Sequence, residues 1–138
     1  MAINEIRSGG DLLARHIPSA EAWSGGLQFF SGEEDFIQVG TWGYGAGKEL
    51  LPHIHNAVPR TVQWTQEVLY VRKGSLRAFV YDRSEALVAE IEVGAGDVLI
   101  LLNGGHGYRI QEGGTEVLEI KNGPYLGPDV DRRRFPGK

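Results

Sequence analysis

Glycine is the residue that most constrains this fold, because it occurs 20 times in 138 residues and separates the apolar segments from one another. Glycines at short, regular separations are typical of turns that join many short strands. The chain therefore predicts an all-β fold of eight to ten strands with almost no helix, arranged as a sandwich or barrel. The clearest groups are Gly43/Gly45/Gly47, Gly94/Gly96, Gly104/Gly105/Gly107 and Gly113/Gly114.

The segments between these glycines have strand patterns. Residues 86–93 alternate apolar and other side chains, which is typical of a strand buried on one face. Residues 98–102 are apolar at every position, which indicates a strand covered on both faces. We expect further strands at 36–44, 50–55, 67–72, 76–81, 108–111 and 116–121.

The length corresponds to one domain, residues 1–138. We expect an N-terminal lead-in over 1–35, irregular in its first 26 residues apart from one helical turn at 10–15. The strands then occupy 36–121. A tail over 122–138, with three prolines, should be loop.

Composition excludes several classes of function. Without cysteine, there can be no disulfide, thiolate metal site or cysteine nucleophile. The net charge of −4, with scattered basic residues, argues against nucleic acid as a partner. No apolar run approaches a membrane span, and the first ten residues lack the apolar centre of a signal peptide. We therefore expect a cytoplasmic protein that does not bind membranes.

Three of the four histidines lie in a context that suggests a metal site. His53 and His55 are two residues apart, so on a strand both imidazoles point to one face and can reach the same ion. Glu67 begins an apolar strand, where a buried carboxylate is unfavourable unless it is paired or bound to a cation. His106 follows in a glycine-rich turn. The fourth, His16, has no evident partner, and we expect it at the surface.

These residues carry a family resemblance. Gly47 with His53, His55, Glu67 and Gly74 resembles the first cupin motif, and Gly96-Asp97 through His106 resembles the second. The resemblance covers residues 40–121. It implies a double-stranded β-helix, a jelly-roll barrel, in which His53, His55, Glu67 and His106 bind one divalent transition metal, whether Fe, Mn, Ni, Co or Zn.

The chain departs from the common motifs in two places. Eleven residues separate His55 from Glu67, where three or four are usual, so residues 56–66 should form a loop near the metal. In the second motif Leu102 replaces the usual proline, and His106 comes one residue early.

A closer resemblance is to a subfamily of small bacterial cupins that are often encoded among genes for sugar and surface-polysaccharide synthesis. Segments that carry it include His53-Ile54-His55, residues 65–71, residues 104–107 and residues 119–125. Analogy with cupins adds a homodimer and a small-molecule ligand. The resemblance does not establish an activity for the subfamily.

Four more side chains are candidates for catalysis. Arg60 is either a clamp for an anionic substrate or an exposed loop residue. Glu119 and Lys121 share one face of the last strand and become an acid or base and a second cation only if that face is inward. Tyr108 is either a proton or hydrogen-bond donor on the face of His106, or a core aromatic.

Two classes of function follow. A metal held by three histidines and one glutamate can act as a Lewis acid on a hydroxy-carbonyl, sugar-like metabolite, in isomerase, epimerase or lyase chemistry. With Fe(II), the same ligands suit a dioxygenase. The alternative is a cupin that binds a small ligand without catalysis. The subfamily's genetic neighbours favour sugar chemistry.

Overall fold

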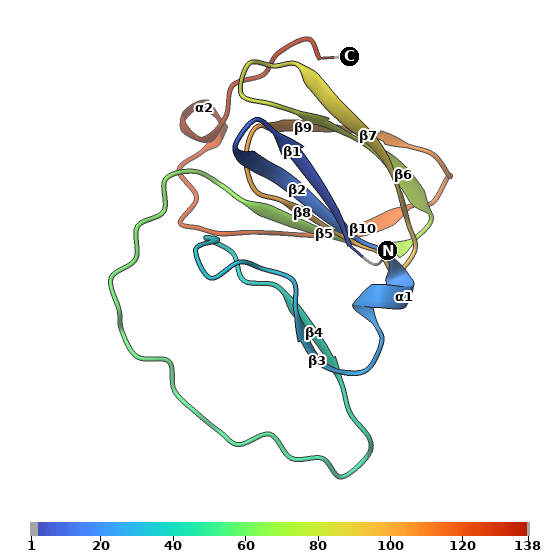
Figure 1. Cartoon of the computed structure of the whole chain (residues 1–138), viewed down its shortest axis with the longest axis vertical. Helices are drawn as coiled ribbons and strands as arrows, with labels where there is room; N and C mark the ends of the chain where they lie inside the picture. The colour runs from blue at the N-terminus through green and yellow to red at the C-terminus, as the bar shows by residue number, and fades with distance from the viewer. Residues whose placement is uncertain (1–2, 138) are drawn as a thin grey trace.

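The computed structural model describes residues 3–137 and is shown in Figure 1. Its described residues form ten strands and two four-residue helices, so the all-β prediction is confirmed. No described helix has the length and apolarity needed to cross a membrane. In chain order the elements are β1 (Asn4–Ser8), β2 (Asp11–Ile17), α1 (Ser19–Ala22), β3 (Gly26–Phe29), β4 (Gly40–Gly43), β5 (Glu67–Lys73), β6 (Ser75–Tyr81), β7 (Leu87–Gly94), β8 (Val98–Leu101), β9 (Gly105–Ile110), β10 (Glu116–Lys121) and α2 (Pro128–Asp131).

Two antiparallel sheets make up the body of the molecule. One has five strands in the order β1-β2-β8-β5-β10, and the other has three in the order β7-β6-β9. We call the face that each sheet turns toward the other its inner face. A core of buried side chains from both sheets fills the space between the two inner faces. This core comprises Ile6, Leu13, Ala14, Leu69, Val71, Leu76, Ala78, Val80, Val93, Leu99 and Leu101.

The N-terminal segment is part of this architecture, and the expected irregular lead-in is wrong. Strand β2 pairs with both β1 and β8 and so lies inside the five-stranded sheet (Figure 1). Leu13 and Ile17 of β2 are fully buried. The sequence hid this strand because Leu12, Leu13 and Ala14 are adjacent apolar residues, which breaks the two-residue period.

His16 is buried in β2, and the expectation of a surface residue without a partner is wrong. Its Nε2 lies 2.9 Å from Oδ2 of Asp97, and the residue is only 7% exposed. The Asp97 carboxylate also accepts hydrogen bonds from the backbone N–H groups of Ser19 and Gly94. Both oxygens of the Asp97 carboxylate therefore have partners, and the His16–Asp97 pair connects the turn before β8 to the N-terminal segment.

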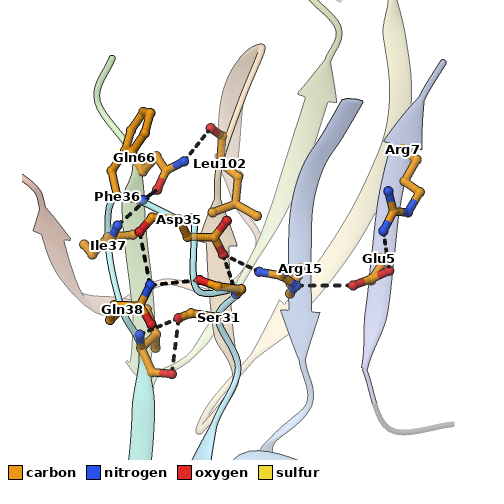
Figure 2. Close-up of polar contacts among 12 residues, drawn as sticks. Glu5, Arg7, Arg15, Ser31, Asp35, Phe36, Ile37, Gln38, Gln66 and Leu102 are labelled. Carbon is orange, nitrogen blue, oxygen red and sulfur yellow. Dashed lines mark hydrogen bonds and ion pairs between the residues drawn. The ribbon is translucent and has the colours of Figure 1, made fainter. Parts of the chain in front are cut away.

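Residues 18–39 cover the outer face of the five-stranded sheet. There a second apolar cluster includes Ile17, Phe30, Val68 and Ile100. Gln66 fixes this cover, since its Oε1 accepts from the backbone N–H groups of Phe36 and Ile37 and its Nε2 donates to the carbonyl of Leu102, directly after β8 (Figure 2). The strand expected over 36–44 is consequently shorter and is confined to β4.

The chain between β4 and β5 leaves the body. Strands β3 and β4 form a separate two-stranded sheet, and residues 44–64, which we call the arm, run outward beyond it in a long loop (Figure 1). The expected strand at 50–55 is absent, because no described strand pairs with it. The tail returns to the body, where Phe135 packs edge-on against Tyr81 with ring centroids 5.0 Å apart.

Candidate functional site

Strand β10 turns Glu119 and Lys121 to the inner face. In the antiparallel ladder Lys121 lies opposite Glu67, and Glu119 lies opposite Leu69. Directly opposed residues point to the same side of a sheet. Because Leu69 belongs to the core between the sheets, Glu67, Glu119 and Lys121 all point inward. Their neighbours Leu118 and Ile120 occupy the outer face, which decides the question that the sequence left open.

Strand β9 contributes from the opposite sheet. His106 lies opposite Val80, and Tyr108 lies opposite Ala78, both fully buried core residues. His106 and Tyr108 therefore also point inward, with ring centroids 5.5 Å apart. His106 meets Glu67 across the space between the sheets, with Nε2 2.9 Å from Oε2. Two residues 39 positions apart in the sequence thus form one pair.

Charge is distributed unequally among the carboxyl groups of this cluster. Burial favours the neutral form of Glu67, but the hydrogen bond and charge of His106 outweigh it, so the pKa of Glu67 is lowered. Burial raises the pKa of Glu119, and its hydrogen bond with Glu67 raises it further, against the opposing charge of Lys121. Of the two glutamates, Glu67 is thus the ionised carboxylate, and Glu119 is the one that more readily holds a proton.

We call the group formed by Glu67, His106, Glu119, Lys121 and Tyr108 the inner-face cluster. Lys121 Nζ lies 3.6 Å from Glu119 Oε2 and supplies a cation. Burial, with the negative charges of Glu67 and Glu119, raises the pKa of the Tyr108 phenol, which stays protonated at neutral pH. The cluster therefore combines a carboxylate–imidazole pair, a proton-holding carboxyl, an ammonium and a phenol.

A hollow of about 350 Å³ adjoins the cluster. Glu119 and Lys121 line it together with Thr65, Asn122, Tyr125 and Asp131. The sequence indicated none of these last four, because residues outside the strands, such as Thr65 and the tail residues, carry no periodicity that would place them beside β10. A larger hollow of about 530 Å³ lies elsewhere, around Arg15, Phe29 and Phe30, and its guanidinium is already paired with Asp35 at 2.7 Å.

The structure places the other predicted ligands apart from this cluster. His53 and His55 lie on the arm, exposed, with their ring centroids 4.9 Å apart. Arg60 also lies on the arm, where its guanidinium donates to the Val58 carbonyl at 3.4 Å. Among residues 3–137 no three potential ligands come close enough together to hold a metal ion. The four predicted ligands therefore occur as two separate pairs.

Each pair suits one half of a metal site. Ligand atoms at about 2.1 Å from one ion, at right angles to each other, lie roughly 3 Å apart. The 2.9 Å separation of His106 Nε2 and Glu67 Oε2 therefore serves two adjacent ligands as well as a hydrogen bond. The His53 and His55 rings are neighbours, edge to face, with centroids 4.9 Å apart. A complete set requires the arm to meet the inner face.

The sequence matches no known family model, no curated protein and no solved structure.

Proposed function

We propose that this chain is a small cupin-type enzyme that binds one divalent transition metal and acts on a small, sugar-like hydroxy-carbonyl metabolite. The observation that carries the proposal is the His106–Glu67 pair, held at 2.9 Å by strands of two different sheets. Its neighbours Glu119 and Lys121 line a hollow of metabolite size. A buried carboxylate and an imidazole in this arrangement are expensive to place in a core unless a charge or a ligand satisfies them.

His106 and Glu67, with His53 and His55 from the arm, would hold the metal. A divalent ion in such a set supplies Lewis-acid polarisation of a substrate oxygen. The oxygen and nitrogen donors suit Mn, Fe, Co, Ni or Zn. Arg60, on the same arm, would bind an anionic group of the metabolite.

The neighbouring residues favour proton transfer over oxygen chemistry. Glu119 holds a proton more readily than Glu67 and lines the hollow, so it can give a proton to a substrate oxygen or take one from carbon. Lys121 would bind the oxygen that becomes negative, and the protonated phenol of Tyr108 would donate a hydrogen bond to the substrate. Isomerisation, epimerisation and elimination all need such groups, whereas dioxygenation does not depend on them.

Metal analysis of the purified protein tests this proposal. Incubation with each first-row divalent metal, followed by desalting, should leave about one ion per chain. Glu67→Gln and His106→Ala should each reduce retention at least tenfold, consistent with the loss of one ligand. Glu116→Gln, on strand β10 next to the strand that carries Glu67, is the matched control, because that carboxylate is exposed and pairs with Arg72. A wild-type protein that retains none of these metals contradicts the proposal.

A further inference from the structure

The arm contacts almost nothing in the described part of its own chain. Every residue from 42 to 64 is exposed, and Leu51 and Ile54 are 85% and 90% exposed. The hydrogen bonds of residues 45–63 stay within that stretch. Only at its end does Trp64 Nε1 donate to the Leu102 carbonyl, at 2.7 Å. An ordered segment that leaves large apolar side chains in water indicates a surface that another chain covers.

The body has a matching opening. Among the described residues β9 pairs only with β6, and β10 only with β5, so each of these strands has a free backbone edge. Ile110 and Val117 lie opposite buried core residues and point inward, yet they are 58% and 36% exposed. The core is therefore uncovered where β9 and β10 end the two sheets. His106 lies on β9, one of these two edge strands, and Glu67 lies opposite Lys121 of the other, β10.

The chemistry of the arm fits that opening. An extended segment can pair with a free strand edge through its backbone, with alternate side chains pointing inward. Leu51, His53 and His55 form one such alternate set, which offers an apolar group to the uncovered core and two imidazoles to the site. Arg60 brings positive charge toward Glu67 and Glu119.

The arm's direction favours a second copy as the partner rather than its own body. Pro52 and Pro59 hold it extended, and it runs away from its own two sheets (Figure 1). Surfaces of protein complexes usually keep their shape on binding, so a segment fixed in this direction meets another molecule without rearrangement.

The β3–β4 hairpin gives a second, independent reason to expect a partner molecule. Leu27, Phe29 and Trp42 on the isolated β3–β4 hairpin are 56%, 63% and 58% exposed. They lie outside the arm, so folding the arm back on its own body would leave them uncovered. An isolated two-stranded hairpin is marginal in water. Each copy carries both an arm and an opening, which is the condition for a closed two-fold exchange.

We propose that two copies of this chain exchange arms. Residues 44–64 of each copy pair with the free edges of β9 and β10 of the other, so that Glu67 and His106 of one copy face His53 and His55 of the other. Backbone pairing and apolar burial do not depend on a metal. Only the shared ligand set rests on the proposed function.

Cross-linking tests the exchange without reference to metal. The chain has no cysteine, so Leu51→Cys on the exposed arm and Ile110→Cys on the inner face of β9 each provide a unique thiol. The two full-length variants are co-expressed and treated with a short bismaleimide. A cross-linked dimer on a denaturing gel is expected. Ser84→Cys, in the β6–β7 turn, replaces Leu51→Cys in the matched control and should give no dimer.

Two results overturn the exchange. The first result has two parts: the two co-expressed single-cysteine variants give no cross-linked dimer, and a variant with both cysteines in one chain is cross-linked but migrates at the mass of a monomer. The arm then folds onto its own body. The other is a wild-type protein that sediments as a monomer at the cross-linking concentration.

Complementation then separates the exchange from the metal proposal. The double variant His53→Ala/His55→Ala, co-expressed with Glu67→Gln, should retain metal in about one quarter of all sites, since half the dimers are mixed and each has one intact site. Arms that act within their own chain would restore none, which overturns the shared site. A cross-linked dimer of the two cysteine variants, together with a wild-type protein that retains no metal, overturns the proposed function and leaves the exchange standing.

Discussion

The hydrogen bonds of the Gln66 side chain allow us to predict how much this residue, at the base of the arm, contributes to the free energy of unfolding. It is 4% exposed and satisfies the backbone N–H groups of Phe36 and Ile37, at 2.8 and 3.1 Å, and the Leu102 carbonyl, at 3.1 Å (Figure 2). Gln66→Leu keeps the volume but leaves both N–H groups without an acceptor. The Leu102 carbonyl keeps the Trp64 donor.

Each orphaned donor is only partly buried and therefore costs about 1–2 kcal/mol, so Gln66→Leu should lower the free energy of unfolding by about 2–4 kcal/mol. For a domain of this size that corresponds to a fall in Tm of about 8–16 °C. Urea and thermal unfolding followed by circular dichroism measure both. Gln63→Leu, three residues earlier on the exposed arm, is the control and should change stability by less than about 0.5 kcal/mol. Equal stability of the two variants would refute this role for Gln66.

Three further predictions concern backbone strain, pH and metal. In Gly104→Ala, the added Cβ would lie 2.2 Å from the Tyr81 carbonyl oxygen, on a backbone with a φ of +74°. Thermal unfolding should therefore show that the free energy of unfolding falls by at least about 2 kcal/mol, and a fall below about 0.5 kcal/mol would contradict this. Hydrogen bonds from Arg7 and Arg15 lower the pKa of Glu5, so the stabilisation that Glu5 contributes is complete above its unfolded pKa and is lost as the pH falls through the folded value. In Glu5→Gln, the free energy of unfolding measured in urea should therefore fall less steeply between about pH 6 and pH 3 than in the wild type. An unchanged slope would contradict this. Metal at 100 times its Kd should stabilise the wild-type protein by about 2.7 kcal/mol and so raise its Tm. An equal rise in the Tm of Glu67→Gln would contradict the proposed ligands.

The strands in the middle of the chain were predictable because their signals are local. Strands β6, β7, β8 and β10 lie within a residue or so of the expected ranges. Each combines a regular apolar pattern with a glycine-containing or polar turn, and both are legible in a short window. Strand β2 was missed because its burial depends on pairing with β8, about 85 positions away.

The candidate site was predictable in its residue types and only partly in its arrangement. The approach of His106 to Glu67 follows from strand pairing within one chain. The inward direction of Glu119 and Lys121 needed the register of β10 against β5, because Leu118 and Ile120 make both faces plausible in sequence. The histidines at 53 and 55 could not be placed by strand pattern, because the segment that carries them has no strand partner in its own chain.

In the proposed site, one metal is bound by Glu67 and His106 together with two imidazoles from an arm. X-ray absorption spectroscopy of the metal-loaded protein counts these imidazoles directly. The wild type should show three, and His53→Ala/His55→Ala should show one, with the remaining positions filled by water. A coordination shell that is unchanged in that double variant would contradict the claim.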